Sequence, residues 1–294
     1  MDRNGLTISM IFEAESANYG EGLGNVASLK KISRGNGDSY SYISRQALRY
    51  NIIGQMGVDN TPLGKDGSVI QFEAKTTITD YPEIDLFGYM KTVKPTKTRS
   101  AVARLSNAVA LESFNADLDF LTNKGLLDRY NGANSSEDTK GNNIAQSEIH
   151  KSYYAYTITV DLDKVGIDTN DDIKLDNNVK CERVTLLLNT IKLLYRDIKG
   201  RRENLTPIFV IGGVYETKNP FFENRLTVKN NKLGVNTIKG TMDIIPDAEK
   251  QYTHIGLLEG IFSNDHEITT NLEGVTSVGE VFRLLCEDVA DVYK

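Results

Sequence analysis

Five segments of the chain show either alternation of apolar and polar residues or enrichment in β-branched and aromatic side chains. A period of two is typical of strands that bury one face. The predicted strands are Leu6 to Ala14, Val69 to Thr79, Ala101 to Leu111, Tyr153 to Leu162 and Pro207 to Tyr215. The pattern therefore predicts a sheet-rich chain.

Apolar residues recur at intervals of three and four in two later segments, as in helices that pack one face on a core. The first stripe is Val184, Leu187, Leu188, Ile191, Leu194, Tyr195 and Ile198. It predicts a helix that ends at Gly200 and packs on the sheet. Ser277 and Glu280, at capping-box spacing, accompany a second stripe made of Val278, Phe282, Leu285, Val289 and Val292. It predicts a final helix that closes the domain.

The order of these elements is strand, helix, strands, a long interruption, strand, helix and strand. This order predicts an α+β fold with an RRM-like (ferredoxin-like) sheet. The interruption, residues 112–150, is too polar for a core and too long for an ordinary turn. Such an excursion is usually disordered or functional. Because no proline-rich linker or internal repeat divides the chain, residues 1–294 are predicted to form one elaborated domain.

The composition is that of a soluble protein and argues against a membrane protein, a disulfide-rich protein and a zinc protein. The chain is 39% hydrophobic and 25% charged, which is ordinary for a soluble globular protein. It has no run of eighteen apolar residues and no visible secretory signal, so a cytoplasmic location without membrane contact is expected. Its two cysteines, Cys181 and Cys286, argue against both a disulfide framework and a zinc site. We expect no cofactor.

Charge is segregated along the chain, although the net charge is -6. Residues 30–49 contain five Lys and Arg against one acid, and residues 91–104 contain five against none. Residues 160–182 carry seven acids against three lysines. This distribution predicts one basic and one acidic face, and the basic face suits a polyanion. The alternative, that these are scattered solvated charges, remains open.

The first strand is followed by a glycine-studded loop and then by a helix with cations. The loop contains Gly20, Gly22, Gly24, Lys30, Lys31 and Arg34, and the helix contains Arg45, Gln46 and Arg49. A spacing of four places the guanidiniums of Arg45 and Arg49 on one helical face. Arginine forks grip phosphate oxygens, and glycines let the main chain approach closely. The segment therefore predicts an anion-binding surface.

Two further groups of residues leave alternatives open. Arg201 and Arg202 follow the predicted helix end and make a third cationic site, but cations there also favour the helix dipole. Asp117 and Asp119 could bind a metal or act on a ribose phosphate, although surface acids are the default interpretation. No dinucleotide fingerprint, Walker lysine motif, complete calcium loop or zincin spacing is present.

Four segments together resemble a known family: the first strand, Arg45 to Arg49, Asp85 to Met90, and Gly200 to Leu205. They are similar to the repeated crRNA-binding backbone subunit of type I CRISPR surveillance complexes, Cascade, and most of all to the DevR group of type I-B systems. The resemblance implies a non-enzymatic, hand-shaped protein with thumb and finger regions that acts in antiviral defence. It also implies four partners: the crRNA, target DNA reached through the guide, further copies stacked helically, and other Cascade subunits.

The resemblance also implies roles for individual residues. The guide backbone would lie on Lys30, Lys31, Arg34, Arg45, Gln46 and Arg49, with Arg201 and Arg202 on the other side of the groove. Residues 112–150 would be the thumb, and the candidates for a wedge between bases are Leu118, Phe120 and Leu121. The rival hypothesis is a metal-dependent RNA endonuclease of the type III backbone kind, which would use Asp117, Asp119 or Asp85 around a divalent ion.

Overall fold

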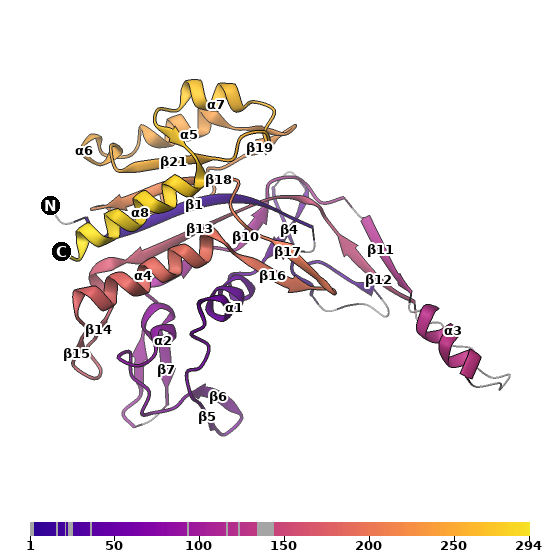
Figure 1. Cartoon of the computed structure of the whole chain (residues 1–294), viewed down its shortest axis with the longest axis horizontal. Coiled ribbons are helices and arrows are strands. Elements are labelled where there is room, and N and C mark those ends of the chain that lie inside the picture. Colours follow the sequence, from indigo (N-terminus) through magenta and orange to yellow (C-terminus); the bar gives the residue numbers. More distant parts are fainter. Residues whose placement is uncertain are drawn as a thin grey trace.

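A long sheet forms the centre of the molecule in the computed structural model (Figure 1), which describes residues 3–15, 17–20, 22, 26–35, 37–92, 94–115, 117–122, 124–133 and 144–294. Its strand order is β22-β21-β18-β1-β13-β10-β4-β3, and β9 pairs with β13. The bounds are β1 Gly5–Ala14, β3 Lys31–Ser33, β4 Ser39–Ile43, β9 Ala103–Leu105, β10 Ala108–Ala110, β13 Ser152–Asp161, β18 Phe209–Tyr215, β21 Thr253–Leu257 and β22 Val275–Thr276. The α+β class predicted from the sequence is confirmed.

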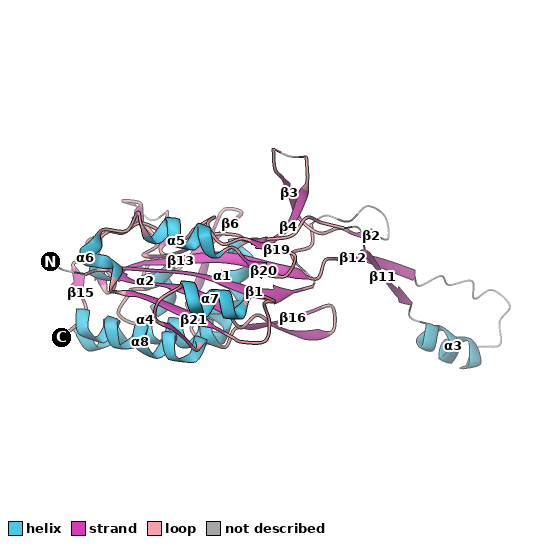
Figure 2. Ribbon diagram, turned by 90° about the horizontal axis from the view of Figure 1, so that it is seen from above, coloured by secondary structure: helices cyan, strands magenta, loops and turns pink. Residues whose placement is uncertain are grey.

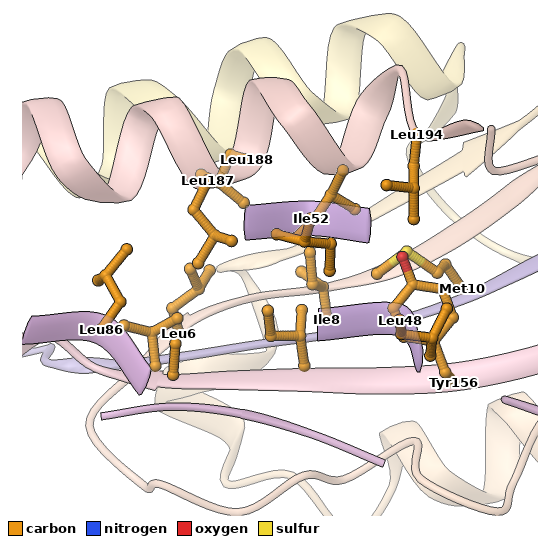
Figure 3. Close-up of a cluster of buried hydrophobic side chains, with 14 of the residues drawn as sticks. Leu6, Ile8, Met10, Leu48, Ile52, Leu86, Tyr156, Leu187, Leu188 and Leu194 are labelled. Carbon is orange, nitrogen blue, oxygen red and sulfur yellow. The ribbon is translucent and has the colours of Figure 1, made fainter. Parts of the chain in front are cut away.

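One face of the sheet packs against three helices: α1 (Arg45–Met56), α4 (Asn177–Lys192) and α8 (Val278–Val292). Alternate residues of β1, including Leu6, Ile8 and Met10, point to this face and are at most 1% exposed. They meet Leu48 and Ile52 of α1 in the same core cluster (Figure 3). Since burial of each such side chain contributes about 1.5–3 kcal/mol, this core fixes α1 on the sheet.

The opposite face is covered only in part. Residues 216–252 and 258–274 pack a second core cluster over β18 and β21, and Ile11 of β1 belongs to that cluster. These segments contain β19 (Val228–Lys229), β20 (Lys232–Leu233), α5 (Val235–Met242), α6 (Asp247–Lys250) and α7 (Asp265–Asn271). Farther along the same face, Thr7, Ser9 and Thr157 line surface hollows instead. The described segments therefore cover this face only in part, although these three side chains are themselves at most 4% exposed.

Two insertions leave the sheet. Residues 57–101 carry β5 (Leu63–Asp66), β6 (Val69–Phe72), α2 (Pro82–Phe87), β7 (Tyr89–Lys91) and β8 (Lys97–Arg99). The second insertion, which we call the arm, comprises β11 (Asp117–Thr122), α3 (Lys124–Ala133) and β12 (Ile144–Ile149) and corresponds to the predicted thumb segment. Figures 1 and 2 show the arm extending far beyond the sheet, with α3 at its outer end. At its base β12 pairs with β2 (Val26–Ala27).

The prediction that the helix continues to Gly200 is wrong. Helix α4 ends at Lys192, and a hairpin of β16 (Tyr195–Ile198) and β17 (Arg201–Asn204) follows. Lys199 and Gly200, with φ of 50° and 77°, form the turn, as a tight hairpin requires. Arg201 and Arg202 therefore lie on a strand, and the helix-dipole explanation of their position no longer applies. Short hairpin β14–β15 (Ile167–Asp168 and Ile173–Lys174) precedes α4, after the 3-10 turn Leu162–Lys164.

Two predicted strands are shorter than expected. The segment from Val69 to Thr79 is a strand only to Phe72, because a hairpin with β5 exposes Val69 and Ile70 by 58% and 62% and the chain then turns. The segment from Ala101 to Leu111 divides into β9 and β10. The five residues from Leu105 to Val109 face the four residues from Ala155 to Ile158 of β13, so one extra residue makes a β-bulge there.

Candidate nucleic-acid interface

The start of α1 is fixed by hydrogen bonds from three directions. Ser44 caps the helix, accepting from the Ala47 N–H at 3.3 Å, and its hydroxyl donates to Asn18 Oδ1 at 2.8 Å. The Arg45 N–H donates to Asn107 Oδ1, in the bulge between β9 and β10, at 2.9 Å. These bonds tie the helix to the loop after β1 and to the sheet, so the orientation of its first turn is defined.

Arg45 and Arg49 are exposed on the outer face of α1, as their spacing predicts. Neither guanidinium makes an ion pair with any residue that the structure describes. The first turn of α1 carries no acid, and a helix N-terminus has a partial positive charge. Two available cations and a positive helix end thus coincide at one place.

Surface hollows connect these cations into a track. Arg45, Gln46 and Arg49 line a hollow of about 340 Å³ together with Arg104 of β9. Arg45 and Arg104 also line the next hollow, of about 320 Å³, which lies over the open part of the sheet. That hollow shares Ser106 and Thr157 with a third, of about 330 Å³, which Arg34 lines. The structure therefore brings together four of the predicted residues: Arg34, Arg45, Gln46 and Arg49.

Arg104 is a member of this track that was not among the predicted site residues. It donates to Asp161 Oδ2 at 3.0 Å, and Lys164 and Lys218 lie 3.2 and 3.8 Å from the same carboxylate. Burial alone would raise the pKa of Asp161, but hydrogen bonds from Arg104 and Lys164 and the charge of Lys218 outweigh burial and hold this pKa below its usual range. Lys218 also pairs with Asp163, so these three cations face two carboxylates and keep one excess positive charge, which attracts an anion.

The loop cations have different surroundings. Lys31 forms an ion pair with Glu148 at 2.7 Å, and its ammonium lies 4.2 Å from the centre of the Phe114 ring. The Arg34 guanidinium stacks 4.1 Å above Tyr40, while Lys30 is half-buried. Lys31 therefore helps to anchor the arm, because Glu148 lies on β12. Of the predicted loop glycines, Gly24 lies outside the described residues.

Arg201 and Arg202 are engaged by carboxylates. Arg201 pairs with Glu203 at 2.7 Å and with Glu15 at 3.1 Å. Arg202 donates two hydrogen bonds to Asp197, at 2.9 and 3.0 Å, and lies 4.5 Å from the centre of the Tyr195 ring. The β16–β17 hairpin faces α1, because the Tyr195 N–H donates to Gln55 Oε1 at 3.3 Å. A role of these two arginines in binding stays a prediction.

The predicted wedge residues all lie on β11 of the arm. Leu118, Phe120 and Leu121 are 46%, 60% and 43% exposed, which is unusual for large apolar side chains. Leu118 and Phe120 share one face of the strand, whereas Leu121 points to the other. Two hydrogen bonds to Glu148 hold the base of the arm. The Tyr19 hydroxyl donates to the Glu148 backbone carbonyl at 3.1 Å, and the Leu29 N–H donates to the Glu148 carboxylate at 2.8 Å.

The aspartates of the rival endonuclease hypothesis do not converge. Asp85 is fully buried and accepts hydrogen bonds from Arg99 at 2.5 Å, Arg183 at 2.7 Å and the Gly166 N–H at 2.9 Å. It therefore anchors the insertion 57–101 to the body. Asp117 and Asp119 are exposed on the arm. Among the described residues, no three His, Cys, Asp or Glu side chains gather where they could hold a metal ion. Nor does that part of the chain contain a helix long and apolar enough to cross a membrane.

Comparisons with known proteins agree with the resemblance seen in the sequence. Two solved structures titled as CRISPR RNA-guided surveillance complexes contain chains of similar fold. The first, described as pre-nicking, has a TM-score of 0.63 at 13% identity and covers 97% of this chain and 100% of the other. The second has a TM-score of 0.59 at 14% identity and covers 96% and 98%. No protein of curated function matches the sequence.

A family model matches residues 6–233, well over half of the chain. Its description is CRISPR-associated negative auto-regulator DevR/Csa2. The matched range includes β1, the arginine helix α1, the insertion with Asp85 and the β16–β17 hairpin, so it covers each segment on which the resemblance was based. The chain belongs to the DevR/Csa2 family of CRISPR-associated proteins.

Proposed function

We propose that the chain is a non-catalytic backbone subunit of a type I CRISPR surveillance complex, of the type I-B kind. It binds the crRNA through its phosphates and presents the guide to target DNA. The observation that carries this proposal is the track of hollows along Arg34, Arg104, Arg45 and Arg49, in which the last two guanidiniums pair with no described residue. Contacts to phosphate carry no sequence information, so binding is independent of the guide sequence.

The fold supports the same proposal. Strands β18, β1, β13 and β10 are adjacent in that order, with antiparallel neighbours, while α1 and α4 pack on one face. This order supports an RRM-like sheet, which is part of the proposal. We assign the thumb to the arm and the wedge between bases to Leu118, Phe120 and Leu121, because these apolar side chains are exposed beyond the body. We infer that copies stack helically along one guide through a heterologous contact, which builds an open helix where its rotation does not close into a ring.

Binding and cleavage assays test the proposal. The purified protein should bind labelled single-stranded RNAs of two unrelated sequences with equal affinity, and RNA of defined length should copurify when a CRISPR array is co-expressed. In magnesium, RNA complementary to the bound guide should stay intact. Failure to bind RNA, or strong dependence on sequence, would contradict the proposal. Cuts at regular intervals that Asp117→Ala or Asp119→Ala abolishes would establish the endonuclease instead.

A further inference from the structure

A large hollow lies beside the arginines of α1, next to the hollow that contains Arg104. We call it the Tyr50 hollow; it measures about 650 Å³, and its lining includes Gln46, Arg49, Tyr50, Gly54, Tyr195 and Asp197. Gln46 and Arg49 line both this hollow and the one with Arg104. Arg49 therefore stands between two adjoining spaces, and a ligand held by its guanidinium can reach into either.

Tyr50 is the most exposed aromatic side chain in the described part of the chain. It is 79% exposed, although tyrosine rings ordinarily bury most of their apolar surface. No hydrogen bond, ring contact or cation–π contact engages it within that part. Across the hollow, Tyr195 is 37% exposed and has Arg202 stacked on its ring. Available aromatic rings beside arginines are the means by which proteins bind unstacked bases.

Gly54 keeps the space beside Tyr50 open. It lies one helical turn beyond Tyr50 in α1, where glycine is less favourable than alanine. An ideal Cβ at Gly54 would meet nothing within 4 Å, so close packing does not require glycine there. Its effect is to leave the helix surface next to the Tyr50 ring without a side chain. A flat ring of a ligand could lie there.

Charge in the hollow sets the orientation of a nucleotide. Asp59, Glu83 and Asp197 also line it, and among the residues that the structure describes an arginine, Arg202, binds only the last of these three. These carboxylates repel phosphate, whereas Arg45 and Arg104 attract it on the other side of Arg49. Carboxylates also accept hydrogen bonds from the amino and imino groups of bases. The phosphate is therefore favoured on the Arg104 side and the base in the Tyr50 hollow.

We propose that the Tyr50 hollow receives one unstacked base of the bound RNA, stacked on the Tyr50 ring, while Arg49 holds the adjacent phosphate. The proposal rests on the proposed function, because it takes single-stranded RNA as the ligand. It adds a base contact to an interface otherwise made of phosphate contacts. The contact is tolerant of sequence, since every base has a face that can stack.

Substitutions at Tyr50 test the stacking. Tyr50→Ala should weaken binding of a single-stranded RNA roughly tenfold, within the range that loss of one base–aromatic contact gives. Tyr50→Phe should bind like the unmodified protein, because it keeps the ring. The slope of affinity against salt should not change in either variant, because no phosphate contact is lost. RNA with 2-aminopurine should show fluorescence quenching with the unmodified protein and less quenching with Tyr50→Ala.

Substitutions at Gly54 test the space itself without removing an aromatic ring. Gly54→Gln should fill the hollow and weaken RNA binding roughly tenfold while the melting temperature is kept, since glutamine is a good helix former. Gly54→Ala, which adds one methyl group, is the matched control and should bind normally. Normal RNA binding by both Tyr50→Ala and Gly54→Gln overturns the base site and leaves the proposed function intact. Absence of RNA binding by the unmodified protein overturns the proposed function.

Discussion

Replacement of Asp85 by asparagine should strongly destabilise the protein. The carboxylate is 0% exposed, and the Arg99 and Arg183 side chains that pair with it are only 8% and 6% exposed. Asp85→Asn keeps the size of the side chain but leaves two buried guanidiniums without a counter-charge. Removing one partner of a buried ion pair costs about 3–5 kcal/mol. We expect a loss of this size in the free energy of unfolding, because the burial of these groups leaves little water to replace the carboxylate.

Urea unfolding followed by far-ultraviolet circular dichroism measures this loss, since the chain has no tryptophan for fluorescence. Asp197→Asn is the matched control: it removes a carboxylate that also binds an arginine, but that pair is exposed, and no resolvable change is expected. A loss below about 1 kcal/mol for Asp85→Asn would refute the anchoring role, given the cost of an unpaired buried charge. If Asp85 were instead a metal ligand of a nuclease, the substitution would abolish magnesium-dependent cleavage and leave stability nearly unchanged.

Two further predictions concern the base and the outer part of the arm. Burial lowers the pKa of His150 below its ordinary value of 6.5, so the unfolded chain binds a proton that the native chain does not. The free energy of unfolding should therefore fall as the pH drops through 6.5 and level off below the pKa that His150 has in the folded chain. Urea unfolding measured from pH 8 to 5 should show this fall. His150→Gln should flatten the dependence of the free energy of unfolding on pH. Phe120→Asp should leave the melting temperature unchanged, because the ring is 60% exposed, and should reduce assembly on long RNA in sedimentation; normal assembly would exclude Phe120 as a wedge.

The central strands were predictable because their pattern agrees with their environment. β1, β13 and β18 are long runs of apolar and β-branched residues that the fold buries on both faces or nearly so. Helix α8 was predictable for a local reason too: Ser277 caps it by accepting from the Glu280 N–H at 3.2 Å. The end of α4 was not, because Leu194 and Ile198 fit the helical stripe although they lie beyond the last helical residue. Only the turn at Lys199 and Gly200 distinguishes a hairpin from a helix that continues to Gly200.

The candidate site was predictable only where it is local in sequence. Arg45, Gln46 and Arg49 share one helix face, and their periodicity alone places them together. Arg104 joins them through strand pairing, which brings β9 beside β13 from far along the chain. The ion pair of Lys31 with Glu148 likewise joins residues 117 positions apart. No local pattern encodes such partners, so the sequence alone does not separate available cations from paired ones.

The salt dependence of RNA binding tests the central claim, that the arginines of α1 hold RNA phosphates. Each phosphate contact to a single strand contributes about 0.7 to the slope of log affinity against log salt concentration. Arg45→Ala/Arg49→Ala should therefore reduce the magnitude of this slope by about 1.4 and weaken binding of unrelated RNAs alike. The control Arg283→Ala removes an exposed arginine of α8 that pairs with Glu280, and it should leave the slope unchanged. An unchanged slope in the double variant, or an equal reduction in the control, would contradict the claim.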